Sequence, residues 1–456
     1  MKKDNRLYTK FIAGTLFPLH EHLKGHNTIA IRERLERSES WPVDKIDRLR
    51  LRRLRAFLEN IKDEVPYFRS LFRQLDFEPC LLDTLEDIRR LPLLSKELIR
   101  SHHEELKSDK SKKLIEQKTS GSSGDPLTFW VDRDRISYDI SARWRAMRWW
   151  GVDIGDPEIV VWGSPIEVRA QDYLRRLRDK LFRTRLLPII NINTNNLDSY
   201  LNEIHSRKPV MMFGYPSALV RLAQRAIERS LDMSHIGARV IFVTSEVLKP
   251  HWREIIEETF GCPTANEYGA RDAGYIASEC PYGSMHIAAE NILVEILDEK
   301  LEPLPFGRVG EVIVTNFASK SFPFIRYRTG DLASLSCKAC SCGRGLPVIE
   351  KVCGRSNDCL VAEDGSYVHD SALNYIIRGL KGVYLYQIVQ EGKKKVRVSV
   401  VGSKEFGKEA ESIIRDCYRN LLGTNMDIVV EKVDTIHSSA SGKFRHVVNN
   451  LTDAGS

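Results

Sequence analysis

A strand–helix–strand unit is written out in residues 210–243, VMMFGYPSALVRLAQRAIERSLDMSHIGARVIFV. An apolar run, Val210–Phe213, is followed by a helical stretch, Ser217–Arg229, and then by a second apolar run, Val240–Val243. We expect Ser217 to be the N-cap of this helix, because a serine hydroxyl accepts a hydrogen bond from an N–H of the first turn. This order of elements is typical of parallel sheets whose strands are joined by helices.

The same alternation extends on both sides of this unit. Apolar runs at Ile159–Trp162 and Leu187–Ile190 precede it, and the pattern continues to Phe260. The sequence therefore predicts a mainly parallel α/β sheet. Nearer the N-terminus, apolar residues at helical spacing predict a helix over about 45–63, which ends before Pro66.

The strand pattern changes near residue 292. Two strand-like runs, Ile292–Leu297 and Val309–Thr315, flank a connection rich in Pro and Gly and indicate a β-rich subdomain. After Gly354 we expect, in order, strands at Leu385–Val389 and Val396–Val401, a helix near Glu405–Leu422 and a strand at Ile428–Val433. The expected fold class is α/β. A large N-terminal domain spans 1–354 and includes the β-rich subdomain from about 275, and a small α+β domain spans 355–456.

The composition excludes several classes of protein. The chain has 456 residues, of which 42% are hydrophobic and 29% charged, so it can bury a large core and is not disordered. No apolar run approaches the ~18 residues of a membrane span, and the N-terminus lacks an export signal. Nine Cys residues, an odd number spread thinly, argue against a disulfide scaffold. We therefore expect a cytoplasmic protein.

The net charge of +7 is unevenly distributed along the chain. Residues 1–62 hold 15 Lys and Arg against 8 Asp and Glu, which equals the net charge of the whole chain. A second basic cluster consists of Arg169, Arg175, Arg176, Arg178, Lys180, Arg183 and Arg185. These segments are either solvated helix faces or a surface for phosphate-rich ligands or anionic lipid. No aromatic residues are interleaved with them, so we expect no nucleic-acid partner.

Five short motifs follow one another along the chain. They are Thr119-Ser-Gly-Ser-Ser-Gly-Asp-Pro126, Asn266-Glu-Tyr-Gly-Ala-Arg-Asp272, Arg326-Tyr-Arg-Thr-Gly-Asp331, Gly354-Arg-Ser-Asn-Asp358 and Ser441-Gly-Lys443. The first contains Ser120, Gly121, Ser122, Ser123 and Gly124. Its glycines let the backbone approach a ligand closely, and its hydroxyls and N–H groups can cradle phosphate oxygens.

In order and spacing, the five motifs together resemble those of the adenylate-forming enzymes, in the branch of phenylacetate–CoA ligase and CapK-like proteins. The resemblance extends from the Val65-Pro-Tyr67 region to Lys443. It implies an AMP-forming acid ligase, which uses ATP and Mg²⁺ to convert a carboxylic acid to an acyl-adenylate with release of pyrophosphate. The acyl group then passes to an acceptor, and coenzyme A is the expected one.

The resemblance also implies where the nucleotide binds. The Ser120–Gly124 loop would wrap the phosphates, and Tyr268 would stack on adenine. Asn266, Glu267 and Gly269 would complete the nucleotide site, and Asp331 would accept hydrogen bonds from the ribose hydroxyls.

The remaining motif residues would act during the reaction. Lys443 would bridge the attacking carboxylate and the α-phosphate. Arg355, which is also expected at the nucleotide, and Asp358 would lie at an interdomain hinge, so that the C-terminal domain moves as a lid. Asp272 stands where the family carries Glu near Mg²⁺, and Asp125 stands where relatives often carry Lys. A hard cation accepts either carboxylate, so we expect adenylation to be retained.

Thiols and an imidazole form a separate group. Cys280 lies six residues before His286, and Cys337, Cys340 and Cys342 cluster downstream. Thiolates and imidazole from two segments fit a structural tetrahedral Zn²⁺ site. The resemblance implies Cys280, His286, Cys340 and Cys342 as the ligands, with Cys337 spare or replacing one of them.

The acid that is activated cannot be deduced from the sequence. Phe213, Gly214, Tyr215 and Ser245 are candidates for its pocket, although the aromatic residues there would serve equally well in an ordinary core. One alternative function is amide or ester formation on a sugar or glycan in polysaccharide biosynthesis. Another is a binding protein that has lost catalysis, against which the retained Lys443 speaks. A homodimer is a further open alternative.

Overall fold

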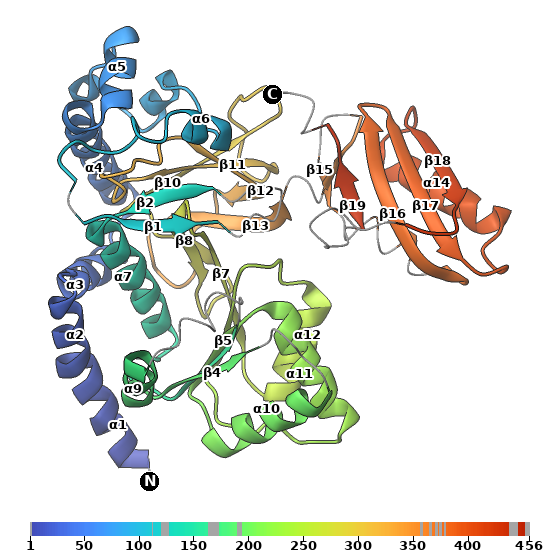
Figure 1. The fold of residues 1–456 in the computed structure, drawn as a ribbon, viewed down its shortest axis with the longest axis horizontal. Coiled ribbons are helices and arrows are strands. Elements are labelled where there is room, and N and C mark those ends of the chain that lie inside the picture. The colour runs from blue at the N-terminus through green and yellow to red at the C-terminus, as the bar shows by residue number, and fades with distance from the viewer. Residues whose placement is uncertain are drawn as a thin grey trace.

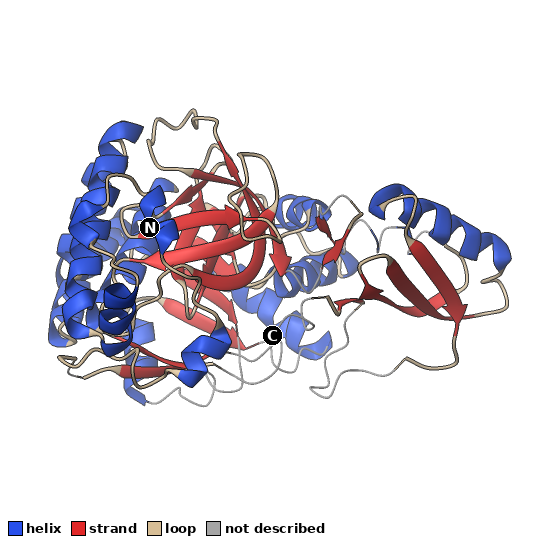
Figure 2. Ribbon diagram, turned by 90° about the horizontal axis from the view of Figure 1, so that it is seen from above, coloured by secondary structure: helices blue, strands red, loops and turns tan. Residues whose placement is uncertain are grey.

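The computed structural model describes residues 2–111, 113–119, 127–162, 173–188, 194–355, 359–363, 367–369, 373, 376–377, 380–436 and 446–451. Figure 1 shows a larger body, built around a long sheet, and a smaller C-terminal sheet beside it. Helices lie on the outside of the larger body and strands run through its middle (Figure 2). This arrangement confirms the expected α/β fold class.

The long sheet joins eleven strands of the described residues in the order β10-β11-β12-β13-β9-β8-β7-β6-β5-β3-β4. Its parallel half consists of β3 (Glu158–Trp162), β4 (Thr184–Pro188), β5 (Met211–Gly214), β6 (Val240–Val243) and β7 (Thr264–Ala270). Its antiparallel half consists of β8 (Gly274–Glu279), β9 (Met285–Ile287), β10 (Ile292–Leu297), β11 (Gly310–Asn316), β12 (Tyr327–Ser336) and β13 (Val348–Arg355). The change of pattern was expected near residue 292, whereas the strand direction already changes between β7 and β8, and the β-rich part continues the same sheet.

Helices cover the parallel half of the sheet. They are α10 (Thr194–Arg207), α11 (Pro216–Glu228) and α12 (Pro250–Phe260). The expected N-cap of α11 is wrong: Pro216 occupies the first turn, and the cap position is Tyr215. Ser217 instead donates both its N–H and its hydroxyl to the carboxylate of Glu246, at 3.0 and 2.9 Å. A proline is favoured at a helix start because its missing N–H needs no partner there.

The N-terminal third of the chain is mainly helical. Its helices are α1 (Lys2–Phe11), α2 (Phe17–Leu23), α3 (Thr28–Ser38), α4 (Val43–Glu64), α5 (Pro66–Gln74), α6 (Lys96–Ser101) and α7 (Arg133–Trp149), with the hairpin β1 (Ile115–Lys118) and β2 (Thr128–Val131). The helices from α3 onward share the main core with the antiparallel half of the sheet. The helix expected over about 45–63 is confirmed as α4, whose apolar face is buried in the main core. No helix within the described residues is long and apolar enough to span a bilayer.

The C-terminal sheet has the order β18-β17-β16-β19. Its elements are β16 (Val383–Gly392), β17 (Lys395–Gly402), α14 (Lys408–Leu422), β18 (Asp427–Lys432) and β19 (Val447–Asn449). The predicted β-β-α-β order is confirmed, whereas the three-residue strands β14 (Cys359–Val361), β15 (Tyr367–His369) and β19 were not predicted. Among the described residues, the buried core of this region runs from Leu360 to Val447.

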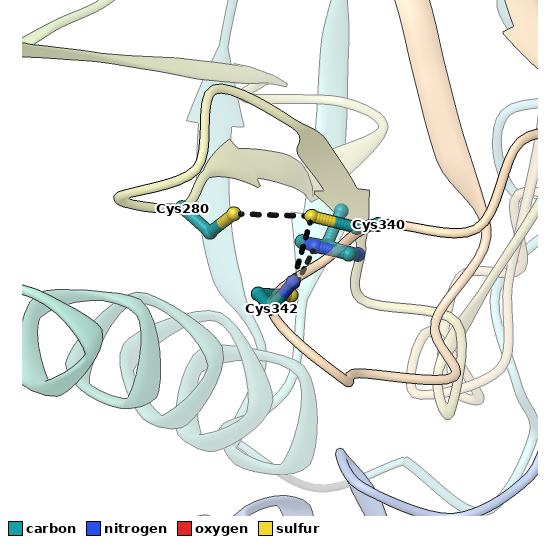
Figure 3. A group of neighbouring side chains, drawn as sticks. Cys280, Cys340 and Cys342 are labelled. Atoms are coloured by element: carbon teal, nitrogen blue, oxygen red, sulfur yellow. Dashed lines mark hydrogen bonds between the residues drawn. The ribbon is translucent and has the colours of Figure 1, made fainter.

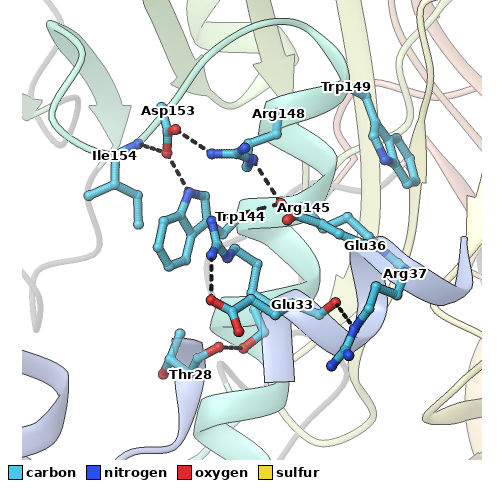
Figure 4. Close-up of polar contacts among 12 residues, drawn as sticks. Thr28, Glu33, Glu36, Arg37, Trp144, Arg145, Arg148, Trp149, Asp153 and Ile154 are labelled. Carbon is cyan, nitrogen blue, oxygen red and sulfur yellow. Dashed lines mark hydrogen bonds and ion pairs between the residues drawn. The ribbon is translucent and has the colours of Figure 1, made fainter. Parts of the chain in front are cut away.

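A buried polar network ties α3 and α7 to the sheet. Arg145 on α7 donates to Glu290 at 2.6 Å, and Ser38 on α3 donates to the same carboxylate oxygen at 2.7 Å. The side chains of Arg145 and Glu290 are only 2% and 1% exposed. One turn along α7, Arg148 pairs with Glu36 at 2.7 Å and with Asp153 at 2.5 Å nearer the surface (Figure 4).

Replacing Arg145 with Met should lower the free energy of unfolding by about 3–5 kcal/mol, because Glu290 would keep a buried charge without its partner. Denaturant titration measures this change. Arg148→Met is the matched control, since that ion pair is more exposed and should contribute no more than about 1 kcal/mol. Equal effects of the two substitutions would show that the buried Arg145–Glu290 pair stabilises the fold no more than the exposed ion pairs of Arg148 do.

Candidate active site

The carboxyl ends of the parallel strands bring three segments of the chain together. The register aligns Gly214 of β5 with Val243 of β6, and Val243 with Asn266 of β7. The next residues along each strand are therefore also neighbours at this edge. Ligands of open α/β sheets bind outside the carboxyl ends of the strands. The residues expected around the acid and around the adenine base thus lie along the same edge of the sheet.

Three of the predicted nucleotide residues meet in space. Tyr268 on β7 donates its hydroxyl to Asp331 on β12 at 2.9 Å, although the two lie 63 residues apart in sequence. Asp331 is the register partner of Arg355 on β13, and Arg355 Nε lies 3.8 Å from its carboxylate. The Asp331 side chain is 17% exposed, so its carboxylate still reaches solvent. This arrangement holds a carboxylate of β12 between a phenol of β7 and a guanidinium of β13.

Asp272 lies next to this group and is buried. Tyr327 donates its hydroxyl to Asp272 Oδ2 at 2.5 Å, and the N–H of Ala273 donates to Oδ1 at 3.0 Å. Asp272 also contributes electrostatically to the raised pKa of Asp331, so the two carboxyl groups share one environment. Sequence reasoning gave Tyr327 no role, although it lies within the quoted motif that ends at Asp331.

The other residues of the β7 motif differ in what they contact. The N–H of Asn266 donates to Glu279 at 2.9 Å. Glu267 is buried and accepts hydrogen bonds from Arg143 and from the hydroxyl of Tyr275, each at 3.3 Å. Burial raises the pKa of Glu267, and Arg143 opposes this shift. At Gly269 a Cβ would lie 2.8 Å from the carbonyl oxygen of Gly274, so the close approach of β7 and β8 requires glycine there.

Aromatic rings line the neighbouring strand ends. Trp162 stacks on Tyr215 with ring centroids 4.1 Å apart and on Phe213 at 5.4 Å. The guanidinium of Arg143 lies 4.1 Å above the Phe213 ring. At Gly214, a Cβ would meet the backbone of Val161 at 2.6 Å.

Ser245, the remaining candidate for the acid pocket, adopts a left-handed backbone conformation with φ +68°. Such a conformation is costly for a residue with a side chain, and strained residues of this kind cluster at functional sites. Sequence reasoning missed Arg143, because its contact with Phe213 and Glu267 depends on the packing of α7.

The predicted zinc ligands converge on one point. One ligand atom from each of Cys280, His286, Cys340 and Cys342 lies within 4.8 Å of all the others. Cys280 Sγ and Cys340 Sγ are 3.7 Å apart, and Cys342 Sγ is 3.2 Å from His286 Nε2 (Figure 3). His286 Nδ1 lies 3.2 Å from the carbonyl oxygen of Leu346, which orients Nε2 toward the thiols. Cys337 is exposed and is not part of this group.

Several expected site residues lie outside the described residues. They are Ser120, Gly121, Ser122, Ser123, Gly124, Asp358 and Lys443. Their roles stay predictions from the sequence.

The ionised carboxylate of Asp331 should destabilise the folded protein at neutral pH. Burial raises its pKa to about 6, with Asp272 adding to the shift and Arg355 and Tyr268 opposing it. The folded state therefore binds more protons than the unfolded state between about pH 4 and 6, and stability falls as the pH rises through this window. Asp331→Asn should be more stable than the wild type by about 1–3 kcal/mol at pH 8 and by much less at pH 4. Unfolding titrations at both pH values measure the difference, and a pH-independent difference would contradict the expectation.

The chain is similar to several known proteins. Residues 360–450 match the CapK C-terminal domain family. Protein CapK of Staphylococcus aureus is 25% identical over 88% of this chain and 89% of its own. Phenylacetate-coenzyme A ligase of Thermus thermophilus is 24% identical over 91% and 92%. A crystal structure of 2-hydroxyisobutyryl-CoA ligase in an open conformation, with 2-HIB-AMP and CoA, has a TM-score of 0.69 at 20% identity and covers 91% of this chain and 93% of that one.

Proposed function

We propose that this chain, which resembles CapK and the phenylacetate–CoA ligases of the adenylate-forming superfamily along nearly its whole length, is an AMP-forming acid ligase. In the first step a carboxylate oxygen of the substrate attacks the α-phosphorus of ATP, and pyrophosphate leaves as the acyl-adenylate forms. In the second step the thiol sulfur of coenzyme A attacks the acyl carbonyl carbon. The thiol gives up its proton and AMP leaves.

The observation that carries the proposal is the meeting of Tyr268, Asp331 and Arg355, which come from three different strands. A carboxylate can accept hydrogen bonds from two neighbouring hydroxyls, which suits the ribose of ATP. Arg355 supplies a fixed positive charge beside the nucleotide and limits the repulsion between Asp331 and the phosphates. The Tyr268 ring takes the adenine, and its hydroxyl keeps the Asp331 carboxylate oriented.

Asp272 fits a role beside Mg²⁺. Its carboxylate is buried and held by Tyr327 and the backbone, so it is presented in one orientation. When bound, Mg²⁺ neutralises charge on the phosphates during the attack. The aromatic side chains at the ends of the parallel strands exclude water from the acid. The acid carboxylate meets the nucleotide at the sheet edge shared by Tyr215, Ser245 and Tyr268.

The C-terminal region is assigned the role of a lid. In this proposal residues 1–354 form the adenylation domain and 355–456 the lid, with Arg355 and Asp358 at the hinge. Arg355 is the last residue of β13, so the boundary coincides with the end of the large sheet. Rotation of the lid would bring Lys443 to the α-phosphate in the first step and remove it for the second.

A structural Zn²⁺ site at Cys280, His286, Cys340 and Cys342 is part of the proposal. The 3.7 Å separation of two thiol sulfurs matches the edge of a tetrahedron with Zn–S bonds of about 2.3 Å. Four protein ligands leave no open position for water or substrate, so the ion would stabilise the fold without taking part in the reaction. The β12–β13 connection would thereby be fixed onto the β8–β9 hairpin.

The proposal also covers the cellular location, the oligomeric state and the acyl acceptor. We expect a cytoplasmic enzyme, with a homodimer as an alternative that gel filtration with light scattering decides. Transfer to a sugar or glycan in polysaccharide biosynthesis stays the alternative to transfer to coenzyme A.

Incubation with ATP, Mg²⁺ and a panel of carboxylic acids tests the function. Pyrophosphate release that depends on the acid, together with acyl-hydroxamate when hydroxylamine is added, is the expected result. Consumption of the coenzyme A thiol in the same reactions identifies the acceptor, whereas hydroxamate without thiol consumption indicates an amine or a glycan. ATP turnover that no acid stimulates would contradict an acid ligase.

A further inference from the structure

One surface of the molecule carries both apolar and basic side chains. Its apolar members lie on α1, α2 and α9 (Tyr173–Leu181) and are between 41% and 78% exposed; they are Leu7, Phe11, Leu19, Leu23, Leu177 and Leu181. Each helix contributes a pair at i, i+4 spacing, so the two members of a pair share a helix face. We call this surface the N-terminal face.

Several contacts hold α9 against the first two helices. The Tyr8 hydroxyl donates to the carbonyl oxygen of Leu181 at 2.9 Å, and Arg183 donates to the Thr9 hydroxyl at 2.7 Å. Phe17 packs against Phe182 with ring centroids 5.9 Å apart. Figure 1 shows the three helices gathered at one end of the larger body. These contacts place α9 beside α1 and α2, although the hydrogen-bonded residues lie 173 and 174 positions apart in sequence.

The helices are anchored on their other side. Ile12, in the π-helical turn Ile12–Leu16 between α1 and α2, is fully buried, and Phe17 is 6% exposed and packs edge-on against Trp144. The exposed leucines thus belong to helices that are fixed to the domain. Their exposure is a property of the folded protein rather than of a loose terminus.

Basic residues outnumber acidic ones on the N-terminal face, where Asp156 lies beside Thr9 and Arg183. Residues 6–24 and 175–183 carry eight Lys and Arg against two carboxylates: the basic residues are Arg6, Lys10, Lys24, Arg175, Arg176, Arg178, Lys180 and Arg183. Glu21 is buried and Asp179 is paired with Arg178. Burial lowers the pKa of Lys24 at the end of α2; Glu21 opposes this shift, and Arg178 and Arg175 of α9 add to it, so these cations repel one another. A negatively charged partner would relieve this repulsion.

We propose that the N-terminal face docks on the surface of a membrane that contains anionic lipid. Helices that lie in a membrane interface combine exposed Leu and Phe with Lys and Arg, because the apolar groups enter the acyl boundary while the cations meet the headgroups. A second copy of the chain fits this face poorly, since a two-fold contact would place the same cations against one another. The proposal is independent of the ligase activity.

Sedimentation with vesicles tests the docking. The intact chain should bind vesicles of phosphatidylcholine mixed with phosphatidylglycerol, and should bind pure phosphatidylcholine at least about tenfold less. Leu7→Ser with Leu23→Ser should weaken binding at least about tenfold, and Lys10→Glu with Lys180→Glu at least about 20-fold. Raising NaCl from about 0.1 to 1 M should release the protein.

The matched control is Phe306→Ser, which removes an apolar side chain of 62% exposure in the connection between β10 and β11. It should bind vesicles like the wild type, and the melting temperatures of all variants show whether they are folded. Binding that ignores anionic lipid, or that survives both double substitutions, would overturn the proposal. So would a doubling of the mass in solution that the Leu7 and Leu23 substitutions abolish, because the face would then be a dimer contact.

Discussion

Cys340→Ser is expected to remove one equivalent of zinc per chain and to lower the melting temperature by about 10 °C or more. A structural metal site does not exist in the unfolded chain, so the free energy of binding the ion is felt as folding free energy. For a domain of about 350 residues, with an unfolding entropy of about 2 cal/mol/K per residue, ten degrees corresponds to about 7 kcal/mol. Elemental analysis of protein purified without added metal, followed by calorimetry, measures both changes.

The loss of stability should be confined to the place where the β12–β13 connection meets the β8–β9 turn. Cys280 and His286 flank the β8–β9 turn, whereas Cys340 and Cys342 lie in the connection between β12 and β13. β13 pairs with β9 at only two positions, so hydrogen bonding alone holds this junction weakly. Removing a ligand should loosen the junction and leave any adenylation by the remaining folded protein intact.

Cys337→Ser is the matched control, because Cys337 is a thiol of the same loop that lies outside the ligand group. It should retain the zinc and the melting temperature of the wild type. Zinc well below one equivalent in the wild type would refute the site. Loss of turnover per folded molecule in Cys340→Ser would refute a purely structural role.

The parallel half of the fold was predictable because its information is local. Short apolar runs alternate with amphipathic helices, and each strand of β3, β5 and β6 coincides with a predicted run. The join between the two halves was not predictable. β7 pairs with β6 in parallel through residues 264–266 and with β8 in antiparallel fashion through 267–270, and this change of partner leaves no mark in the hydrophobic pattern.

Side-chain contacts between residues far apart in the chain could not be predicted from the sequence. Ser217 has the chemistry of an N-cap, yet Glu246, 29 residues away, takes both of its donors. Tyr327 and Arg143 acquire their contacts with Asp272 and Glu267 only when the sheet and α7 come together. By contrast, the four residues that the family resemblance implies as zinc ligands do lie together in the structure. Few residue types bind zinc, so the candidates could be narrowed from the sequence.

The second large effect concerns the step that makes the acyl-adenylate. Lys443→Ala should reduce acid-dependent pyrophosphate release by at least about 10²–10³-fold, the usual cost of removing one group that stabilises developing charge. ATP binding should change only a few-fold, because in the proposed site Tyr268 and Asp331, which are joined by a hydrogen bond on the large domain, hold the nucleotide. Stopped-flow measurement of pyrophosphate release and calorimetry with ATP separate the two quantities.

The matched control for that variant is Lys432→Ala, which removes an exposed lysine from β18 in the same C-terminal region, where it donates to the carbonyl oxygen of Ser403. It should leave the rate of pyrophosphate release and the affinity for ATP near those of the wild type.

Asp331→Ala should show the opposite pattern to Lys443→Ala, with ATP affinity reduced by about 2–4 kcal/mol because charge-assisted hydrogen bonds to the ribose are lost. If the lid acts as proposed, Lys443→Ala should still transfer an acyl group from a preformed acyl-adenylate to coenzyme A, since the lysine is needed only while the α-phosphate is attacked. Near wild-type pyrophosphate release in Lys443→Ala, or equal loss of both half-reactions, would assign the lysine to another role.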